Sequence, residues 1–302
     1  MLAGAALASV ALAVDPATAA TPALVDRTLA HWWVFPAAVA FSTVAIGSGV
    51  SGALFFSPFF MLVVGLTPSQ AIGAGLLTEV FGMGNGLRSY VRQEVVDWAT
   101  ARWLLLFAVP TVIAGALAAH VVPADALRLA FGGGLVLLGG FMVVYPAPER
   151  CEPGAEADDA DEDDVVTVVE AADGETYRYA TCGRGPGGAL AAVGGFLTGL
   201  ISAGLPEITT SQLVLRCRVP PRVAVATSVV VLAITAAVGA TIHAASATPV
   251  WHVVAWSVPG VVVGSTVGSR FGKHLPDDLM ETGLGAVFAL VGGVVLAVEL
   301  VP

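Results

Sequence analysis

The sequence predicts an all-α integral membrane protein with two inverted repeats, each a re-entrant broken-helix hairpin followed by three transmembrane helices. Three observations lead to this fold class: the composition, a pattern that occurs twice, and the distribution of positive charge. Hydrophobic residues make up 56% of the 302 residues and charged residues only 12%, and the mean hydropathy is +0.84. These values exclude an ordinary soluble domain.

The second observation is a glycine-containing pattern that recurs about 152 positions later. Gly47-Ser48-Gly49-Val50-Ser51-Gly52 corresponds to Gly199-Leu200-Ile201-Ser202-Ala203-Gly204, and each copy interrupts an apolar run. The flanking residues keep the same spacing: Pro68 with Pro220, Trp98 with Trp251, Pro123 with Pro276, and Gly139-Gly140 with Gly292-Gly293. A hydrophobic segment interrupted at the same place in both halves of a duplicated chain is typical of a secondary transporter.

The first interrupted run, residues 32–66, is too long for one spanning helix. As a single helix it would measure about 52 Å, whereas the hydrocarbon core is ~30 Å thick. A break at 47–52 leaves two arms of roughly 14 residues, each about 21 Å long. We therefore expect a re-entrant hairpin, whose non-helical backbone must be surrounded by protein or water. Residues 190–215 repeat the arrangement with shorter arms.

Each hairpin is followed by three apolar segments of the length that a bilayer requires. The predicted helices span 69–90, 101–122 and 124–145 in the first half, and 221–243, 250–269 and 278–301 in the second. The predicted organisation is an N-terminal apolar segment (1–31), a first transmembrane repeat (32–146), an acidic linker (147–188) and a second transmembrane repeat (189–302). The N-terminal segment has the features either of a cleaved signal peptide or of an uncleaved interfacial start.

The third observation is the distribution of positive charge. If each half is one hairpin plus three crossings, one face of the membrane carries eleven basic residues: Arg88, Arg92, Arg102, Arg150, Arg178, Arg184, Arg216, Arg218, Arg222, Arg270 and Lys273. The opposite face carries only Arg27 and Arg128. If both interrupted segments crossed fully, the split would be seven against six. Because cytoplasmic loops collect Lys and Arg, we expect a multi-pass plasma-membrane protein with both termini outside and the linker cytoplasmic.

The linker contains 12 of the 23 acidic residues, between Glu149 and Glu175. Such a block is typical of a solvated segment. Within it, residues 165–169 and 176–179 flank Asp173-Gly174, which predicts a small β-hairpin. Three cysteines, Cys151, Cys182 and Cys217, lack CxxC spacing. Cys151 and Cys182 bracket the linker and could pair with each other, but reduced thiols are expected for them if the linker is cytoplasmic.

Five stretches of the chain form a recognisable set: GSGVSGALFFSPFF, LTPSQAIGAG and SYVRQEVVDW in the first half, and GLISAGLPEITT and VPPRVAVATSV in the second. In these stretches the chain resembles the sulfite exporter TauE/SafE family of membrane permeases. The resemblance covers residues 36–146 and 188–300. It implies two inverted four-segment halves and the export or import of sulfur oxyanions or organosulfonates.

The glycine clusters indicate where such an anion would bind. A helix that starts at mid-membrane presents free backbone N–H groups and the positive end of its dipole, which suits a sulfite or sulfonate. Two such starts, near Gly52 and Gly204, would meet around a pseudo-two-fold axis. The candidate residues here are Ser48, Gly49, Ser51, Gly52, Ser202 and Gly204. The alternative is that these glycines only allow close helix packing.

Two carboxylates are expected at membrane depth, Glu79 in mid-span and Glu207 directly after the second break. A charge there costs on the order of 3 kcal/mol, so both are candidates for proton coupling. The alternative is a protonated side chain that only forms hydrogen bonds. The remaining substrate-binding candidates are neutral: Asn85 and Gln212 from their chemistry, and Thr227 and Ser228 from the family resemblance. Each of these four could instead bridge helices or bond to its own backbone.

Two other functions compete with a coupled transporter. Gly49-Val50-Ser51-Gly52 resembles the GxSG of an intramembrane serine protease, which also needs a histidine near Ser51. His243 and His252 are instead expected at the outer surface as interfacial anchors. An uncoupled anion channel of the same fold is the second alternative.

The expected partners are a small anionic substrate and the lipid bilayer, with no nucleic acid. A homo-oligomer is left open. No cofactor and no metal are expected, and the sequence contains no GxxxxGK[ST] or HExxH motif.

Overall fold

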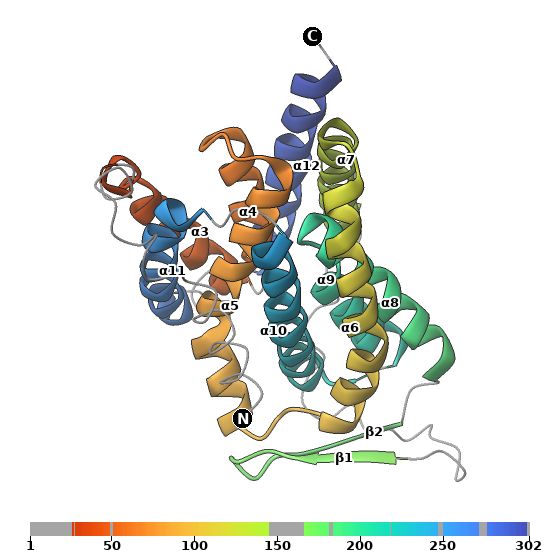
Figure 1. Cartoon of the computed structure of the whole chain (residues 1–302). Coiled ribbons are helices and arrows are strands. Elements are labelled where there is room, and N and C mark those ends of the chain that lie inside the picture. The colour runs from red at the N-terminus through yellow and green to blue at the C-terminus, as the bar shows by residue number, and fades with distance from the viewer. Residues whose placement is uncertain are drawn as a thin grey trace.

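A computed structural model describes residues 26, 28–48, 51–144, 166–180, 184–217, 219–246, 250–271 and 277–300. These residues form a bundle of helices with one small β-hairpin across one end (Figure 1). The first half contains α3 (Val34–Ser48), α4 (Ala53–Leu62), α5 (Pro68–Arg92), α6 (Trp98–Val121) and α7 (Ala124–Val144). The second half contains α8 (Arg184–Ile201), α9 (Leu205–Ser211), the π-helical turn η1 (Gln212–Arg216), α10 (Pro221–Ser246), α11 (Trp251–Phe271) and α12 (Asp277–Leu300).

Both interrupted runs are broken where the sequence predicted. In the first half α3 ends at Ser48 and α4 begins at Ala53, and in the second half α8 ends at Ile201 and α9 begins at Leu205. The expectation of shorter arms in the second half is wrong for α8. This helix already begins at Arg184 and has 18 residues, because its glycine-rich start packs on α6. The second arm is short, and α9 continues directly into η1.

The six uninterrupted helices begin and end within about three residues of their predicted ends, because their apolar runs are long and end at Gly, Pro or charged residues. By length and hydropathy alone, two of the helices that the structure describes, α6 and α10, are long and apolar enough to cross a membrane.

The most extensive helix contacts join α3 to α11, α6 to α8, and α7 to α12, so each pair combines the two halves. Glycines permit this close approach. A Cβ atom added to Gly199 on α8 would lie 2.2 Å from the carbonyl oxygen of Val112 on α6. One added to Gly264 on α11 would lie 2.4 Å from the carbonyl oxygen of Val39 on α3. Small residues bring helix backbones together in this way in membranes.

Helices α5 and α10 pack on each other, and α4 and α9, the helices that follow the two breaks, pack on α5 and α10, respectively. Each half therefore contributes a long helix and the short helix that follows its break to the interior of the bundle. The corresponding helices of the two halves make corresponding contacts: α3 lies on α11 as α8 lies on α6.

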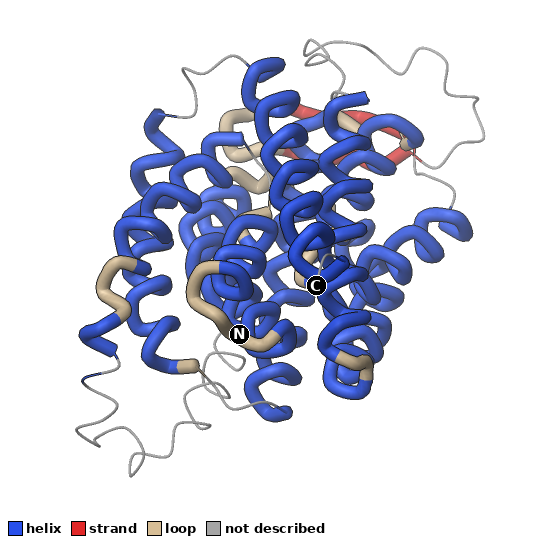
Figure 2. Tube along the Cα trace, turned by 90° about the horizontal axis from the view of Figure 1, so that it is seen from above, coloured by secondary structure: helices blue, strands red, loops and turns tan. Residues whose placement is uncertain are grey.

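The predicted β-hairpin is present (red in Figure 2). Strand β1 (Val166–Glu170) pairs antiparallel with β2 (Thr176–Ala180), and Glu170 lies opposite Thr176. Gly174 supplies the positive φ of 89° that the turn needs. Cys217, after η1, is disulfide-bonded. Cys151 and Cys182, for which reduced thiols were expected, lie outside the described residues.

The hairpin is docked on the helices of both halves. The backbone N–H of Ala172 donates to the carbonyl of Gln93 at 2.9 Å, and the Tyr179 hydroxyl donates to Asp97 Oδ2 at 2.9 Å. Arg222, at the start of α10, donates to Asp173 Oδ2 at 2.9 Å. These contacts and the buried side chain of Tyr179 supply the stability that an isolated two-stranded hairpin lacks in water.

Candidate functional site

A carboxylate from α5 accepts hydrogen bonds at the first helix break. Ser51 and Glu79 are both buried, with 4% and 1% of their surface exposed. The Ser51 hydroxyl donates a hydrogen bond to Glu79 Oε1. The backbone N–H of Ala53, the first residue of α4, donates to the same oxygen at 3.3 Å. Glu79 therefore lies at the start of α4, where the helix dipole is positive.

The second helix break has an unusual backbone. Ser202 has a φ of 56°, which is uncommon for a residue with a side chain and often marks a functional site. Gly204 has a φ of 113°, a conformation that glycine adopts without steric cost. These two residues let the chain leave α8 and turn into α9 within three positions.

The backbone donors at the second break are already in use. The N–H of Gly204 donates to Glu207 Oε2 at 3.1 Å, and the N–H of Leu205 donates to Thr198 Oγ1 at 3.1 Å. Pro206 follows and has no N–H. The expectation of unpaired donors at this break is therefore wrong, because α9 is capped by Glu207 and by the hydroxyl of Thr198.

The two breaks meet in the interior of the bundle. The hydroxyl oxygens of Ser57 on α4 and Ser202 lie 2.6 Å apart, both buried. The Glu207 carboxylate also interacts with the backbone N–H of Ser51, and it is close enough to Glu79 for the two side chains to repel each other when both are ionised. Two acidic side chains from different halves thus face the same small region.

Four buried side-chain atoms in the described part of the chain lack a hydrogen-bond partner: Glu79 Oε2, Glu207 Oε1, Gln212 Oε1 and Ser228 Oγ. Buried polar atoms are nearly always paired, so such exceptions call for a ligand, a water molecule or a proton. Two of the four belong to the carboxylates at the breaks. This region is therefore the candidate functional site.

The other predicted site residues are placed less centrally. The Thr227 hydroxyl accepts a hydrogen bond of 3.1 Å from the backbone N–H of Asp97 and so joins α10 to the start of α6. Gln212 lies close to the start of α8, since a Cβ added to Gly187 would be 3.6 Å from its Oε1. Ser228 is buried beside Thr227.

Three predicted positions fall partly or wholly outside the described residues. Gly49 is not described, and Ser48 and Asn85 are described only by their backbone, at the end of α3 and within α5. Along α5, Asn85 lies about 9 Å beyond Glu79.

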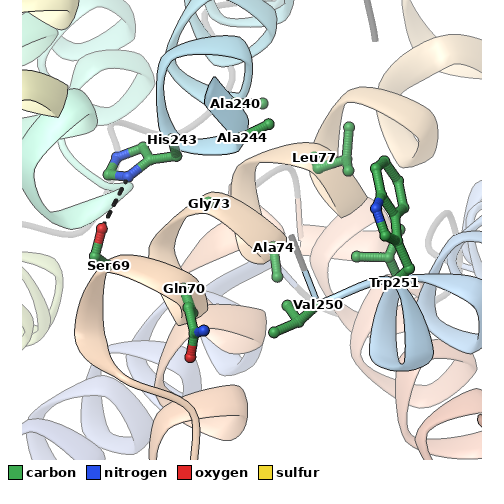
Figure 3. A pocket seen from close by; sticks show the side chains of 11 residues that line it. Ser69, Gln70, Gly73, Ala74, Leu77, Ala240, His243, Ala244, Val250 and Trp251 are labelled. Carbon is green, nitrogen blue, oxygen red and sulfur yellow. Dashed lines mark hydrogen bonds between the residues drawn. The ribbon is translucent and has the colours of Figure 1, made fainter. Parts of the chain in front are cut away.

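Sequence reasoning missed a second polar cluster. The Ser69 hydroxyl oxygen lies 2.9 Å from His120 Nε2 and 3.5 Å from His243 Nδ1 (Figure 3). The other ring nitrogens donate to backbone carbonyls, His120 to Ala116 at 2.7 Å and His243 to Gly199 at 3.0 Å. His243 is only 2% exposed, so its expected role as an interfacial anchor is wrong. Nothing in the spacing of these residues indicated that three helices would bring them together.

This cluster borders a pocket between α5, α10 and the start of α11 (Figure 3). The polar side chains of the pocket wall are those of Ser69, Gln70 and His243, and the remaining side chains are aliphatic apart from the indole of Trp251. In the described structure the Ser51 hydroxyl donates to Glu79, and neither His120 nor His243 has a hydrogen bond with Ser51.

Comparison with known proteins decides the family. The family model described as "Sulfite exporter TauE/SafE" matches residues 34–295. The chain belongs to the sulfite exporter TauE/SafE family. One relative is the probable membrane transporter protein YunE of Bacillus subtilis, with 24% identity over 254 residues that cover 83% of this chain and 90% of the relative. Another is the probable membrane transporter protein ORF9 of Sinorhizobium sp, with 34% identity over 68 residues, 22% of this chain and 26% of the relative. No solved structure matches the chain.

Membership in the TauE/SafE family makes the protein a membrane transporter and not an enzyme. The predicted all-α membrane fold class is confirmed at this level, and the protease alternative is set aside. The bilayer and a small substrate follow as partners of a TauE/SafE transporter.

Proposed function

We propose that the protein is a secondary transporter that moves a small sulfur-containing anion, such as sulfite or an organosulfonate, across the plasma membrane together with protons. The observation that carries this proposal is the first helix break. There, a hydroxyl and a backbone N–H at the start of α4 already hold a carboxylate oxygen. The description of the family model names sulfite, which favours a sulfur oxyanion over other anions.

The donors at the first break suit an oxyanion. Sulfite and sulfonates present several oxygens to hydrogen-bond donors, and the start of a helix offers N–H groups and the positive end of a dipole. The interior excludes water, so these interactions are stronger than in solution. The proposed substrate region lies between residues 48–52 and residues 202–207.

The coupling group in this proposal is Glu207. Its carboxylate reaches both Gly204 N–H and the backbone of Ser51, so it lies between the two breaks. An ionised Glu207 would repel an anion there, and a protonated one would not. Anion binding would then require a proton, which gives anion–proton symport.

The proposed membrane topology has two inverted halves, with residues 147–188 in the cytoplasm and both mature termini outside. Each half would contribute one re-entrant hairpin and three crossings. The helix pair α3–α11 is equivalent to the pair α8–α6 when the two halves are interchanged, which supports a pseudo-two-fold relation between them. The eleven-to-two distribution of basic residues supports the orientation.

Flux into proteoliposomes tests the substrate class. We expect saturable uptake of at least one of sulfite, sulfate, thiosulfate and taurine, and we expect a pH gradient to change its rate. The control is the same set of measurements on empty liposomes. Robust flux of a cation with no saturable flux of any of these four compounds would overturn the proposal, and linear, pH-independent anion flux would identify a channel.

A further inference from the structure

The carboxylate at the first break occupies a site built for an anion. Glu79 Oε1 accepts from the Ser51 hydroxyl and from the Ala53 N–H, and the Gly52 N–H acts on the same carboxylate. All three donors belong to the break or to the first residue of the ten-residue helix α4. We call Ser51, Gly52 and Ala53 the cradle.

Glu79 fills the cradle without being fully satisfied itself. Its second oxygen, Oε2, is buried and has no hydrogen-bond partner in the described structure, although the side chain is only 1% exposed. A carboxylate that serves only to hold two helices together would be expected to have both oxygens paired. The unpaired oxygen is a place for a proton.

The charged surroundings of Glu79 offer no cationic partner among the described residues. The one charge that acts on it is that of Glu207 on α9, which is also negative. Helix α11 contacts this part of α5 through a neutral pair: the hydroxyl oxygens of Thr78 on α5 and Ser257 on α11 lie 2.8 Å apart. From α4 and the first break, Glu79 receives only the neutral donors of the cradle.

A second negative ion could not enter this region beside an ionised Glu79. Two like charges a few ångströms apart repel strongly where water is scarce. If Glu79 takes up one proton and leaves the cradle as a singly charged anion enters, the total negative charge of the region is the same before and after the exchange. The donors of the cradle then pass from one oxyanion to another.

We propose that Glu79 is a tethered competitor of the substrate: its carboxylate occupies the cradle in the empty transporter, and the substrate anion displaces it as Glu79 is protonated. The inference rests on the proposed anion transport and adds the residue that the substrate replaces. One proton from the solution binds to Glu79 for each anion that enters the cradle, and it is released when Glu79 returns there.

Two variants test the proposal through sulfite transport. Glu79→Gln keeps the size of the side chain but cannot take up a proton. It should lower the half-saturating sulfite concentration about tenfold at neutral pH and should weaken the pH dependence of that concentration, which for one coupled proton reaches about tenfold per pH unit. Thr78→Ala, the adjacent change on α5, is the matched control and should behave as wild type. If Glu79→Gln had the same half-saturating sulfite concentration and the same pH dependence as wild type, the proposal would be overturned.

Formate binding tests the cradle without transport. In Glu79→Ala the cradle is empty, and formate, a free carboxylate, should raise the thermal unfolding midpoint of the purified protein at concentrations at least tenfold lower than in wild type. Glu207→Ala should not gain this sensitivity. The formate measurement does not require that a sulfur anion is transported. The tethered competitor and the proposed transport function can therefore be refuted independently. Equal formate sensitivity of Glu79→Ala and wild type would overturn the tethered competitor.

Discussion

At the scale of single residues, Glu79 and Glu207 each lie at a helix break, but they reach it from different helices. Glu79 comes from α5 and lies against the start of α4, whereas Glu207 belongs to α9 and caps its own helix through Gly204. Both have one buried oxygen without a hydrogen-bond partner in the described structure. A cap can be kept by a glutamine, because its side-chain oxygen still accepts the N–H.

Glu207→Gln should therefore fold and transport but carry fewer protons. We expect anion binding to be kept or tightened, and the number of protons moved per anion to fall by about one, because the amide cannot titrate. The proton-to-anion ratio, measured in proteoliposomes from opposing pH and substrate gradients, checks this. Glu299→Gln makes the same chemical change on α12, where Glu299 pairs with Arg128, and should leave the ratio alone. An unchanged ratio in Glu207→Gln would remove Glu207 from the coupling mechanism.

At the scale of elements, the β-hairpin joins the two halves at one end of the bundle. Arg222 of the second half donates to Asp173 and Glu175 of the hairpin and to the side chain of Gln93 in the first half at 2.8 Å. The hydrogen bond from Arg222 holds the pKa of Asp173 below its usual range. The stabilisation from this lowered pKa is complete above the unfolded pKa of about 3.9 and is lost as the pH falls through the lower folded value.

Arg222→Gln should loosen the hairpin at neutral pH. These groups are partly exposed and solvent screens their ion pairs, so we expect only a few-fold increase in the population of the open form. Limited proteolysis of the linker reports that population when cleavage is slow. Arg178→Gln, on the exposed side of β2, is the control and should be cut at the wild-type rate. The difference between wild type and Arg222→Gln should shrink when the pH is lowered toward 3.

At the scale of the whole molecule, the two halves share one helical core within the described residues. The three most extensive helix contacts each combine the halves, and the largest buried cluster includes Leu54 and Phe60 of the first half with Leu232 and Phe288 of the second. A transporter built in this way can move one half against the other only by shifting these contacts.

Cysteine labelling tests the proposed orientation in the membrane. With an impermeant reagent added to intact cells, a cysteine introduced at Ala247 should react, and one introduced at Ala157 in the acidic linker should not. After the cells are permeabilised, both should react, which controls for local accessibility. Strong labelling at 157 in intact cells with none at 247 would invert the topology.

The sequence by itself determined the six uninterrupted helices, both breaks and the β-hairpin, because these depend on local features: apolar runs, glycine and proline positions, and an Asp-Gly turn. It also indicated Ser51, because this residue lies in the first glycine cluster. Glu79 and Glu207 were indicated because a carboxylate among apolar residues is conspicuous. Only the tertiary structure decided that Glu79 fills the start of α4, that α9 caps itself with Glu207, and that His243 is buried beside His120. Each of these depends on which helix faces which across more than one segment, and hydrophobic periodicity does not specify the packing partner of a helix.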